Sequence, residues 1–392
     1  GLGTKAPLNT RKLLKALRKL QVNPLIESIS TELAASDLPG FNTLVVTVTE
    51  ADTKDLTLEL NNHRPDNIGS FQRLVEFEER NLTSNGDNAR ALYANTDGSN
   101  EVEASYTIPV NARDGEIELS FRQIWSRVIT QPFDQLDLVG RSRSLGIEFR
   151  QPIINTPTDE LTLGIQLGRR ESETELLDMP FPLSAGADSD GQTKVTGINL
   201  IQEWVQRNRR SVLALRSDFG LGLDLFASTD NPAPPDGEFF LWRGQAQYVR
   251  QLAATLLQFR TNLQFADRPI VSLEQFGVGG AQTVRGYPQN LLLVDSGVTA
   301  SLDVAIPVFE SLDRSILLQV APFLDYGYGF NQGTTPIAGS NSLLATGVGL
   351  RFRWSDRITA SLDWGIPLIS TNTIDRGFDG SRVFFSISST IF

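Results

Sequence analysis

Most of this chain alternates apolar and polar residues with a period of two, in runs of about ten residues or more. Side chains of a β-strand point alternately to its two faces, so each run predicts a strand with one apolar and one polar face. The clearest run is 210–226, where leucine and phenylalanine alternate with alanine, arginine, aspartate and glycine. Strands of soluble proteins usually end after about five or six residues, whereas a strand that crosses a bilayer needs about nine to eleven. The length of the runs therefore favours a membrane-spanning sheet.

The apolar residues form no long continuous stretch. Hydrophobic residues make up 40% of the 392, yet no segment approaches the roughly 18 consecutive apolar residues of a transmembrane helix. A chain that spans a membrane without such helices must form a closed barrel, because a barrel also pairs every backbone N–H and C=O. The chain has no cysteine, which excludes disulfides, thiolate nucleophiles and cysteine metal sites. The net charge of −11 argues against nucleic acid as a partner, since phosphate binding needs clustered lysine and arginine.

The connections between the predicted strands differ in length on the two sides of the sheet. We place sixteen strands near 54–62, 70–82, 87–97, 99–111, 115–130, 137–151, 159–172, 193–208, 210–226, 239–252, 255–267, 295–309, 315–330, 342–354, 357–368 and 381–392. Connections after even-numbered strands are short, whereas those after odd-numbered strands reach about twenty residues at 173–192 and nearly thirty at 268–294. A soluble β-sandwich has no reason to sort its loops in this way, but an outer-membrane barrel does. The predicted fold class is all-β: a 16-stranded antiparallel transmembrane β-barrel over residues 53–392, with both termini in the periplasm.

Residues 1–52 follow a different pattern. Asn9 can cap a helix in which Leu13, Leu17 and Leu20 recur at helical spacing, and two strands follow at 25–33 and 42–50, separated by a turn at 38–40. A basic amphipathic helix can also lie on a membrane surface or act as a targeting element, but the two strands offer its apolar stripe a better partner. The chain starts at Gly1 without an initiator methionine or a secretory signal, so we interpret it as processed or partial.

Two segments near the C-terminal half carry the candidate site. The sequence SLEQFGVGGAQTVRGYPQN (272–290) lies in the long loop 268–294, and its glycines allow the backbone to fold back tightly. Alternation in the strand at 315–330 places Phe323, Asp325 and Gly327 on the lumen face. We expect the loop to fold into its own barrel and Arg285 to pair with Asp325, and we call these two residues the lock pair. Breaking one partner of a buried ion pair costs on the order of 3–5 kcal/mol.

The two motifs resemble those of the outer-membrane barrel superfamily of BamA and the two-partner secretion transporters (TpsB). The motif residues are Val284, Arg285, Gly286 and Tyr287 in the loop, and Phe323, Asp325 and Gly327 on the wall. The segments 275–308 and 361–368 look like the ShlB/FhaC/HecB-like haemolysin secretion/activation branch, especially its cyanobacterial members. The resemblance implies a sixteen-stranded barrel whose sixth outer loop enters the lumen and whose loop arginine contacts the wall aspartate. It also implies that residues 1–52 are a partial C-terminal POTRA domain (helix, strand, strand).

The same resemblance implies a function. The protein would be a pore in the outer membrane of a Gram-negative-type bacterium that secretes an exoprotein partner, unfolded in the periplasm, without ATP. The POTRA region would capture the substrate, and the long loop 268–294, folded into the lumen, would gate the pore. The implied partners are this exoprotein and outer-membrane lipid or lipopolysaccharide, with a monomeric barrel and no nucleic acid. Two alternatives stay open: a BamA-like insertase that assembles other outer-membrane proteins, and a passive solute porin.

We expect no enzymatic site. The only histidine is His63, which we interpret as a solvated residue of the first outer loop. One histidine excludes multi-histidine metal sites and leaves a Ser-His-Asp triad a single possible base. The carboxylates at 76–79 and 171–175 lack a partner base and are interpreted as pore-wall or loop charges. The GVGG segment is not followed by Lys-Ser/Thr, as a phosphate loop requires. We therefore predict no catalytic residue, no cofactor and no metal.

Overall fold

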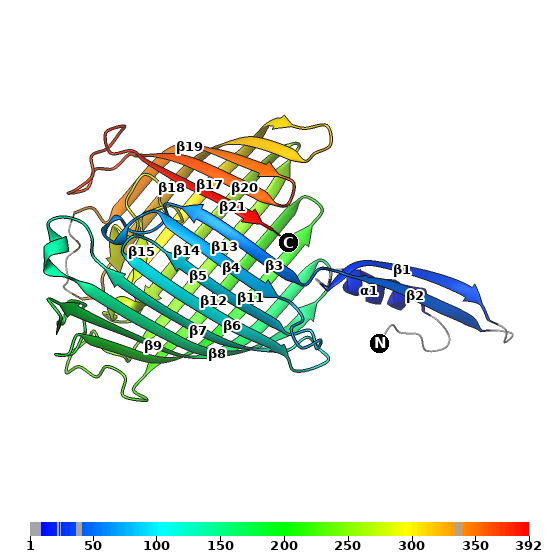
Figure 1. Ribbon diagram of the computed structural model, residues 1–392, viewed down its shortest axis with the longest axis horizontal. Coiled ribbons are helices and arrows are strands. Elements are labelled where there is room, and N and C mark those ends of the chain that lie inside the picture. The colour runs from blue at the N-terminus through cyan, green and yellow to red at the C-terminus, as the bar shows by residue number, and fades with distance from the viewer. Residues whose placement is uncertain are drawn as a thin grey trace.

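The fold was determined as a computed structural model, which describes residues 9–21, 23, 25–36, 41–333, 337 and 339–391 (Figure 1). Residues 1–8 of the predicted POTRA segment, its predicted turn at 38–40 and the last residue of the predicted barrel lie outside these described residues. None of the described helices has the length and apolar character needed to cross a membrane.

A helix and a β-hairpin form the N-terminal unit. Helix α1 (Thr10–Gln21) begins where the side chain of Asn9 accepts the N–H of Lys12 at 3.1 Å, which is the predicted cap. Strands β1 (Ile26–Ala35) and β2 (Asn42–Glu50) pair antiparallel. Leu13 and Leu17 are buried, so the apolar stripe of the helix lies against the protein rather than in solvent. Figure 1 shows this unit projecting from one end of the barrel.

Sixteen antiparallel strands close into a barrel, as the sequence predicts. They are β3 (Lys54–Asn61), β4 (Gln72–Glu79), β5 (Asn88–Asn95), β6 (Ser99–Pro109), β7 (Glu116–Arg127), β8 (Val139–Asn155), β9 (Asp159–Leu176), β11 (Gln192–Asn208), β12 (Ser211–Leu223), β13 (Phe240–Leu252), β14 (Thr255–Ala266), β17 (Ser296–Glu310), β18 (Ile316–Phe330), β19 (Ser342–Trp354), β20 (Ile358–Pro367) and β21 (Arg382–Thr390). A two-residue strand, β10 (Met179–Pro180), pairs antiparallel with the end of β9. Strands that follow one another along the barrel wall are hydrogen-bonded neighbours, and β21 closes the barrel by pairing with β3.

The two faces of the wall differ as the alternation requires. In β18, Phe323 and Asp325 are 4% and 0% exposed, whereas the intervening Leu324 and the following Tyr326 are 48% and 40% exposed. The buried Phe323 and Asp325 therefore face the lumen side, and the exposed Leu324 and Tyr326 face outward. An apolar outer face is stable against lipid, and closure of the barrel pairs the backbone N–H and C=O groups that lipid cannot satisfy.

Short turns lie at the end of the barrel from which the N-terminal unit projects, and the long connections lie at the other end (Figure 1). Within the described part of the long connections there are three 3-10 turns, η1 (Asp66–Ile68), η2 (Phe133–Leu136) and η3 (Ser272–Glu274). The segment 268–294, which we call the lumen loop, also forms a small hairpin of β15 (Phe276–Val278) and β16 (Leu292–Val294). This hairpin was not predicted from the sequence, because strands of three residues are too short to show a period.

The lumen loop packs on the inner face of the wall through two apolar clusters. The first joins loop residues to β19: Val278, Val284, Tyr287, Leu292 and Val294 with Leu343 and Ala345. The second joins the start of the loop to β11, β13 and β14: Ile270 and Val271 with Val195, Phe239, Leu241 and Ala266. The loop is thus fixed against two parts of the wall, and it occupies the lumen.

Candidate gating site

The structure brings the two members of the lock pair together. The guanidinium of Arg285 contacts both carboxylate oxygens of Asp325, with Nε–Oδ2 and Nη2–Oδ1 distances of 2.7 and 2.8 Å. The backbone N–H of Arg285 donates to the same carboxylate at 3.0 Å. Arg285 is 2% exposed and Asp325 is fully buried. Such a bidentate, desolvated contact fixes the orientation of the loop tip as well as its position.

The arginine also contacts two further aspartates that sequence analysis missed. Its Nη1 lies 2.8 Å from Oδ1 of Asp303 on β17 and 3.2 Å from Oδ1 of Asp363 on β20. Two wall arginines share these carboxylates, since Arg351 contacts Asp363 at 2.6 Å and Arg260 contacts Asp303 at 3.3 Å. Three carboxylates therefore face three guanidinium groups. The balance explains how this much charge is accommodated inside the wall, where an unpaired charge is strongly unfavourable.

The remaining motif residues make close packing possible. The ring of Phe323 lies under the guanidinium, with its centroid 3.5 Å from Cζ of Arg285, in a cation–π arrangement. Gly286 has a φ of +100°, which other residues rarely adopt. A side chain at Gly327 would clash with Val278 and Val284 of the loop. The wall glycine and the loop glycine thus allow the two backbones to approach.

Val284 and Tyr287 anchor the loop on either side of Arg285. Both side chains are fully buried in the first apolar cluster. The hydroxyl of Tyr287 lies 2.7 Å from the carbonyl of Ile369 and 3.0 Å from that of Leu344. All seven residues of the two sequence motifs therefore meet in one cluster, and their role in gating stays a prediction.

The missed residues carried a partial signal. Alternation in the predicted strand 295–309 puts Ser301 and Asp303 on its polar face. Asp363 lies in the segment 361–368, which resembles the haemolysin secretion/activation branch. What a single sequence does not give is the register between strands. In the structure Ser301 stands opposite Asp325, and its hydroxyl lies 3.1 Å from Nη2 of Arg285.

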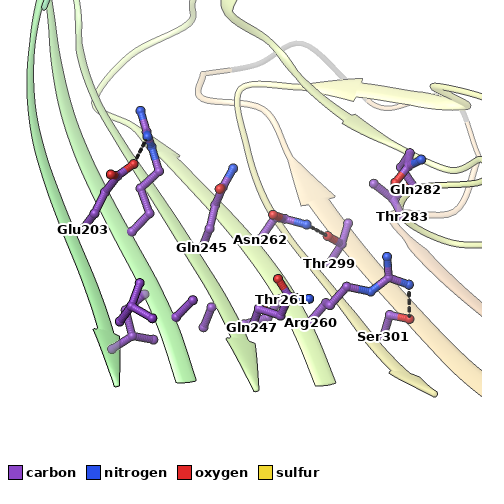
Figure 2. Close-up of a pocket in the computed structure, with 15 residues that line it drawn as sticks. Glu203, Gln245, Gln247, Arg260, Thr261, Asn262, Gln282, Thr283, Thr299 and Ser301 are labelled. Carbon is purple, nitrogen blue, oxygen red and sulfur yellow. Dashed lines mark hydrogen bonds and ion pairs between the residues drawn. The ribbon is translucent and has the colours of Figure 1, made fainter. Parts of the chain in front are cut away.

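A cavity of about 650 Å³ adjoins this cluster (Figure 2). It is bounded by β11–β14, β17 and the loop tip, and Figure 2 shows the polar side chains of Gln245, Asn262 and Thr299 on the strands and Gln282 and Thr283 on the loop. Most of its polar lining is uncharged. The cavity and the lock pair share a wall residue, Ser301, so a molecule in the cavity would lie beside the ion-pair cluster.

The opposite wall carries a ladder of ion pairs between neighbouring strands. Arg90 contacts Glu76 at 2.6 Å and Glu103 at 2.5 Å, and the same pattern continues with Arg122–Glu101 and Arg150–Glu118 contacts of 2.5 and 2.6 Å. The predicted pore-wall charge at Glu76 is therefore neutralised by a neighbouring strand.

The structure corrects the interpretation of His63. Its imidazole is partly buried and stands edge-on to Phe384, with ring centroids 6.3 Å apart, rather than in solvent. The segment that follows β3 is held against β21, since the side chain of Asn62 hydrogen-bonds to the backbone of Val383 and Phe385. Among the residues that the structure describes, no group of three or more histidine, aspartate or glutamate side chains is arranged to hold a metal ion.

The family model described as "Haemolysin secretion/activation protein ShlB/FhaC/HecB" matches residues 40–352. The heme/hemopexin transporter protein HuxB of Haemophilus influenzae (strain 86-028NP) is 20% identical over 380 residues, which is 92% of this chain and 64% of that protein. The chain therefore spans somewhat less than two thirds of the length of this relative.

Solved structures share the fold. CdiB from Escherichia coli superposes with a TM-score of 0.80 at 16% identity, covering 98% of this chain and 71% of that one. CdiB from Acinetobacter baumannii gives 0.73 at 18% identity, covering 98% and 69%. BamA from Haemophilus ducreyi, lacking POTRA domains 1–3, gives 0.64 at 12% identity, covering 98% and 79%. These identities establish the fold alone, and the expected cyanobacterial likeness stays a prediction.

Proposed function

This chain belongs to the haemolysin secretion/activation protein family ShlB/FhaC/HecB, and from this premise we propose that it is the outer-membrane pore through which an exoprotein partner leaves the periplasm. The barrel is an outer-membrane barrel of the kind found in CdiB. The proposal assigns it no catalytic residue and no cofactor. The substrate would pass as an unfolded chain, and the lumen loop would be the gate.

The observation that carries the proposal is the burial of Arg285 among three wall aspartates. A static plug would be most stable with apolar contacts alone, because a buried ion pair gains little over well-packed hydrophobic residues. A charged cluster beside a polar cavity differs from such a plug, because water can hydrate its charged groups when the loop moves away. The arrangement is therefore suited to a segment that leaves and returns.

The lumen wall supports passage of an unfolded polypeptide. Uncharged amide and hydroxyl groups such as Gln245 and Asn262 can hydrogen-bond a passing backbone in any sequence context. The arginine–glutamate ladder neutralises the opposite wall, so a chain of either charge is not held strongly. The wall favours transit over tight binding.

The partners follow from the surfaces. We propose that residues 1–52 are the C-terminal part of a POTRA domain and that a hairpin edge of β1 or β2 captures the exoprotein by β-augmentation. The apolar outer face would contact outer-membrane lipid and lipopolysaccharide. A closed barrel has no unpaired strand edge, which supports a monomer.

Two other functions fit the fold less well. The likeness to BamA, and a closing seam of only five residue pairs between β3 and β21, favour a BamA-like insertase as the second candidate. A passive porin requires an open lumen, and the buried lumen loop argues against it.

The proposal is tested by exoprotein release from cells that carry the full-length protein with Arg285→Ala. We expect release to fall while the barrel still inserts, as judged by heat-modifiable migration in gels. Arg314→Ala is the matched control, because this arginine lies in a short turn with a side chain that is 86% exposed. Normal release from the Arg285→Ala strain would contradict the proposal.

A further inference from the structure

A second buried charge holds the lumen loop, and it has the opposite sign to Arg285. Glu274 in η3 is 3% exposed. Nη1 of Arg170 contacts its two carboxylate oxygens at 2.7 and 2.8 Å, and Nη2 of Arg243 contacts Oε2 at 2.7 Å. Two cations thus converge on one loop carboxylate.

The wall is shaped for this contact. Arg170 lies on β9 and Arg243 on β13, with β11 and β12 between them. Gly197 and Gly220 on these intervening strands line the same small space. Because neither glycine has a side chain, the two arginines can reach across the wall toward the same carboxylate.

A glutamine completes the arrangement. Gln264 on β14 accepts a hydrogen bond from Nε of Arg243 at 2.9 Å and donates to the backbone carbonyl of Glu274 at 2.8 Å. Its amide also donates to the carbonyl of Asp295, at the end of the loop, at 3.1 Å. The side chain and the backbone of Glu274 are therefore both fixed, and the two ends of the loop meet here.

The Glu274 site is separate from the lock pair. Arg285 contacts β17, β18 and β20, whereas Glu274 contacts β9 and β13. Among the ion pairs of the described residues, none joins a member of one site to a member of the other. The tip and the root of the loop are thus held by different parts of the wall.

We propose that Glu274, with Arg170 and Arg243, is a second clamp that positions the root of the lumen loop, and that full opening of the pore requires release of both clamps. This inference rests on the proposed function only in taking the lumen loop as the gate. Release of Arg285 alone would free the tip and leave the root in place. Glu274 is a positioning residue whose loss leaves two arginines facing each other without an anion.

The absence of cysteine from the sequence makes a direct test possible. Single cysteines at Ser272 (root) or Thr283 (tip) of the full-length protein are labelled with a membrane-impermeant maleimide in outer-membrane vesicles. We expect Glu274→Gln to raise the labelling rate at position 272 at least about tenfold and to change position 283 less than about threefold. Arg285→Lys should raise the labelling rate at position 283 at least about tenfold and change that at position 272 less than about threefold. Glu310→Gln, an exposed glutamate beside a short turn, is the control and should change neither rate.

A channel measurement tests the coupling of the two clamps. Single-channel conductance in planar bilayers should rise more in the Glu274→Gln/Arg285→Lys double variant than the sum of the rises in the single variants. The swapped variant Glu274→Arg/Arg170→Glu/Arg243→Glu should return the labelling rate at position 272 toward that of the unsubstituted clamp, because it restores opposite charges. Heat-modifiable migration identifies variants that fold.

Two results would overturn the inference. One is an unchanged rate at position 272 in a folded Glu274→Gln variant, and the other is equal acceleration of both reporters by each single variant, which would mean one clamp. The labelling readout does not involve secretion. If both reporters respond as expected but exoprotein release from the double variant is unchanged, the clamp stands and the gating role of the loop in the proposed function fails.

Discussion

The three aspartates around Arg285 are not equivalent, although each contacts its guanidinium. Asp325 is fully buried and also accepts the backbone N–H of Arg285, whereas Asp363 is buried less completely, with a side chain that is 12% exposed, and is shared with Arg351. Removing the charge of Asp325 leaves a buried arginine with its strongest partner gone. Removing that of Asp363 leaves Arg285 with Asp303 and Asp325.

We therefore expect Asp325→Asn to weaken the closed position of the lumen loop by about 3–5 kcal/mol, and Asp363→Asn by about 0.5–1.5 kcal/mol. The measurement is the labelling rate of a cysteine at position 283 in the folded barrel. If the two substitutions raised the labelling rate equally, the total negative charge around Arg285 would hold the loop, rather than its specific contact with Asp325.

Wall glycines permit the loop tip to reach this cluster. A side chain on Gly365 would clash with the backbone of Gly286, whereas the nearest atom to a side chain at Gly168 is a carbonyl oxygen at 3.8 Å. We expect Gly365→Ala to displace the tip and raise resting conductance in planar bilayers, and Gly168→Ala to leave it unchanged. Unchanged conductance in folded Gly365→Ala would mean that the strand moves instead of the loop.

Much of the cluster around Arg285 could be predicted from residue types and from the alternation of side chains along each strand, but not all of it. Alternation placed Asp325 toward the lumen, and the VRGY segment supplied a loop arginine to meet it. Asp303 and Asp363 were missed because their contact depends on the register of β17 and β20 relative to β18. Glu274 was missed because its partners, Arg170 on β9 and Arg243 on β13, are 104 and 31 residues away in the chain.

At the scale of elements, the short turns are held by side-chain hydrogen bonds. In the turn between β17 and β18, the carboxylate of Asp313 accepts the hydroxyl of Ser311 at 2.6 Å and the N–H and hydroxyl of Ser315 at 3.1 and 2.9 Å. These bonds, first that from Ser311, lower the pKa of Asp313 to about 2. A depressed carboxyl pKa means that the bonds stabilise the turn above the ordinary pKa of aspartate and are lost as the pH falls toward 2.

Amide exchange in this turn should therefore be slow and nearly constant from pH 7 to about pH 4, after correction for intrinsic rates, and should accelerate below that. Asp313→Ala should exchange faster at every pH and lose the acid-dependent step. Persistence of that step in Asp313→Ala would assign it to another group. The matched control is Asp356→Ala in the short turn between β19 and β20. In this variant, amide exchange in the turn of Asp313 and its acid-dependent step should be unchanged.

The strands themselves were the most predictable part, because a lipid-facing side must be apolar along its whole length. All sixteen were placed from alternation, although their ends moved by up to four residues, as in β8 and β9. Near the start of β8, Arg141 and Arg143 continue the exposed row of the apolar Leu145, so the period of two persists where the outer face is charged. The hairpin of β15 and β16 lies in the lumen loop and has no lipid-facing side, so its sequence shows no alternation of apolar and polar residues.

At the scale of the whole molecule, two routes lead out of such a barrel: through the lumen, or sideways through the seam between the first and last strands. The seam joins β3 and β21 through five residue pairs, whereas β8 and β9 share sixteen. An insertase needs the seam to open toward lipid, but a secretion pore that releases a chain through the lumen does not. The seam therefore separates the two candidate functions.

A disulfide across the seam distinguishes them. The hydroxyls of Thr57 and Thr390 lie 3.4 Å apart on opposite strands, so cysteines at these positions can form a bond of ordinary geometry in a chain that has no other cysteine. We expect the oxidised Thr57→Cys/Thr390→Cys protein to release its exoprotein at a rate within about twofold of the reduced protein, since the lumen and its gate are untouched. The single-cysteine variants control for the substitutions. If oxidation stops release and a reductant restores it, the seam must open during transport, and the lumen route, with the gate built on Arg285 and Glu274, is not sufficient.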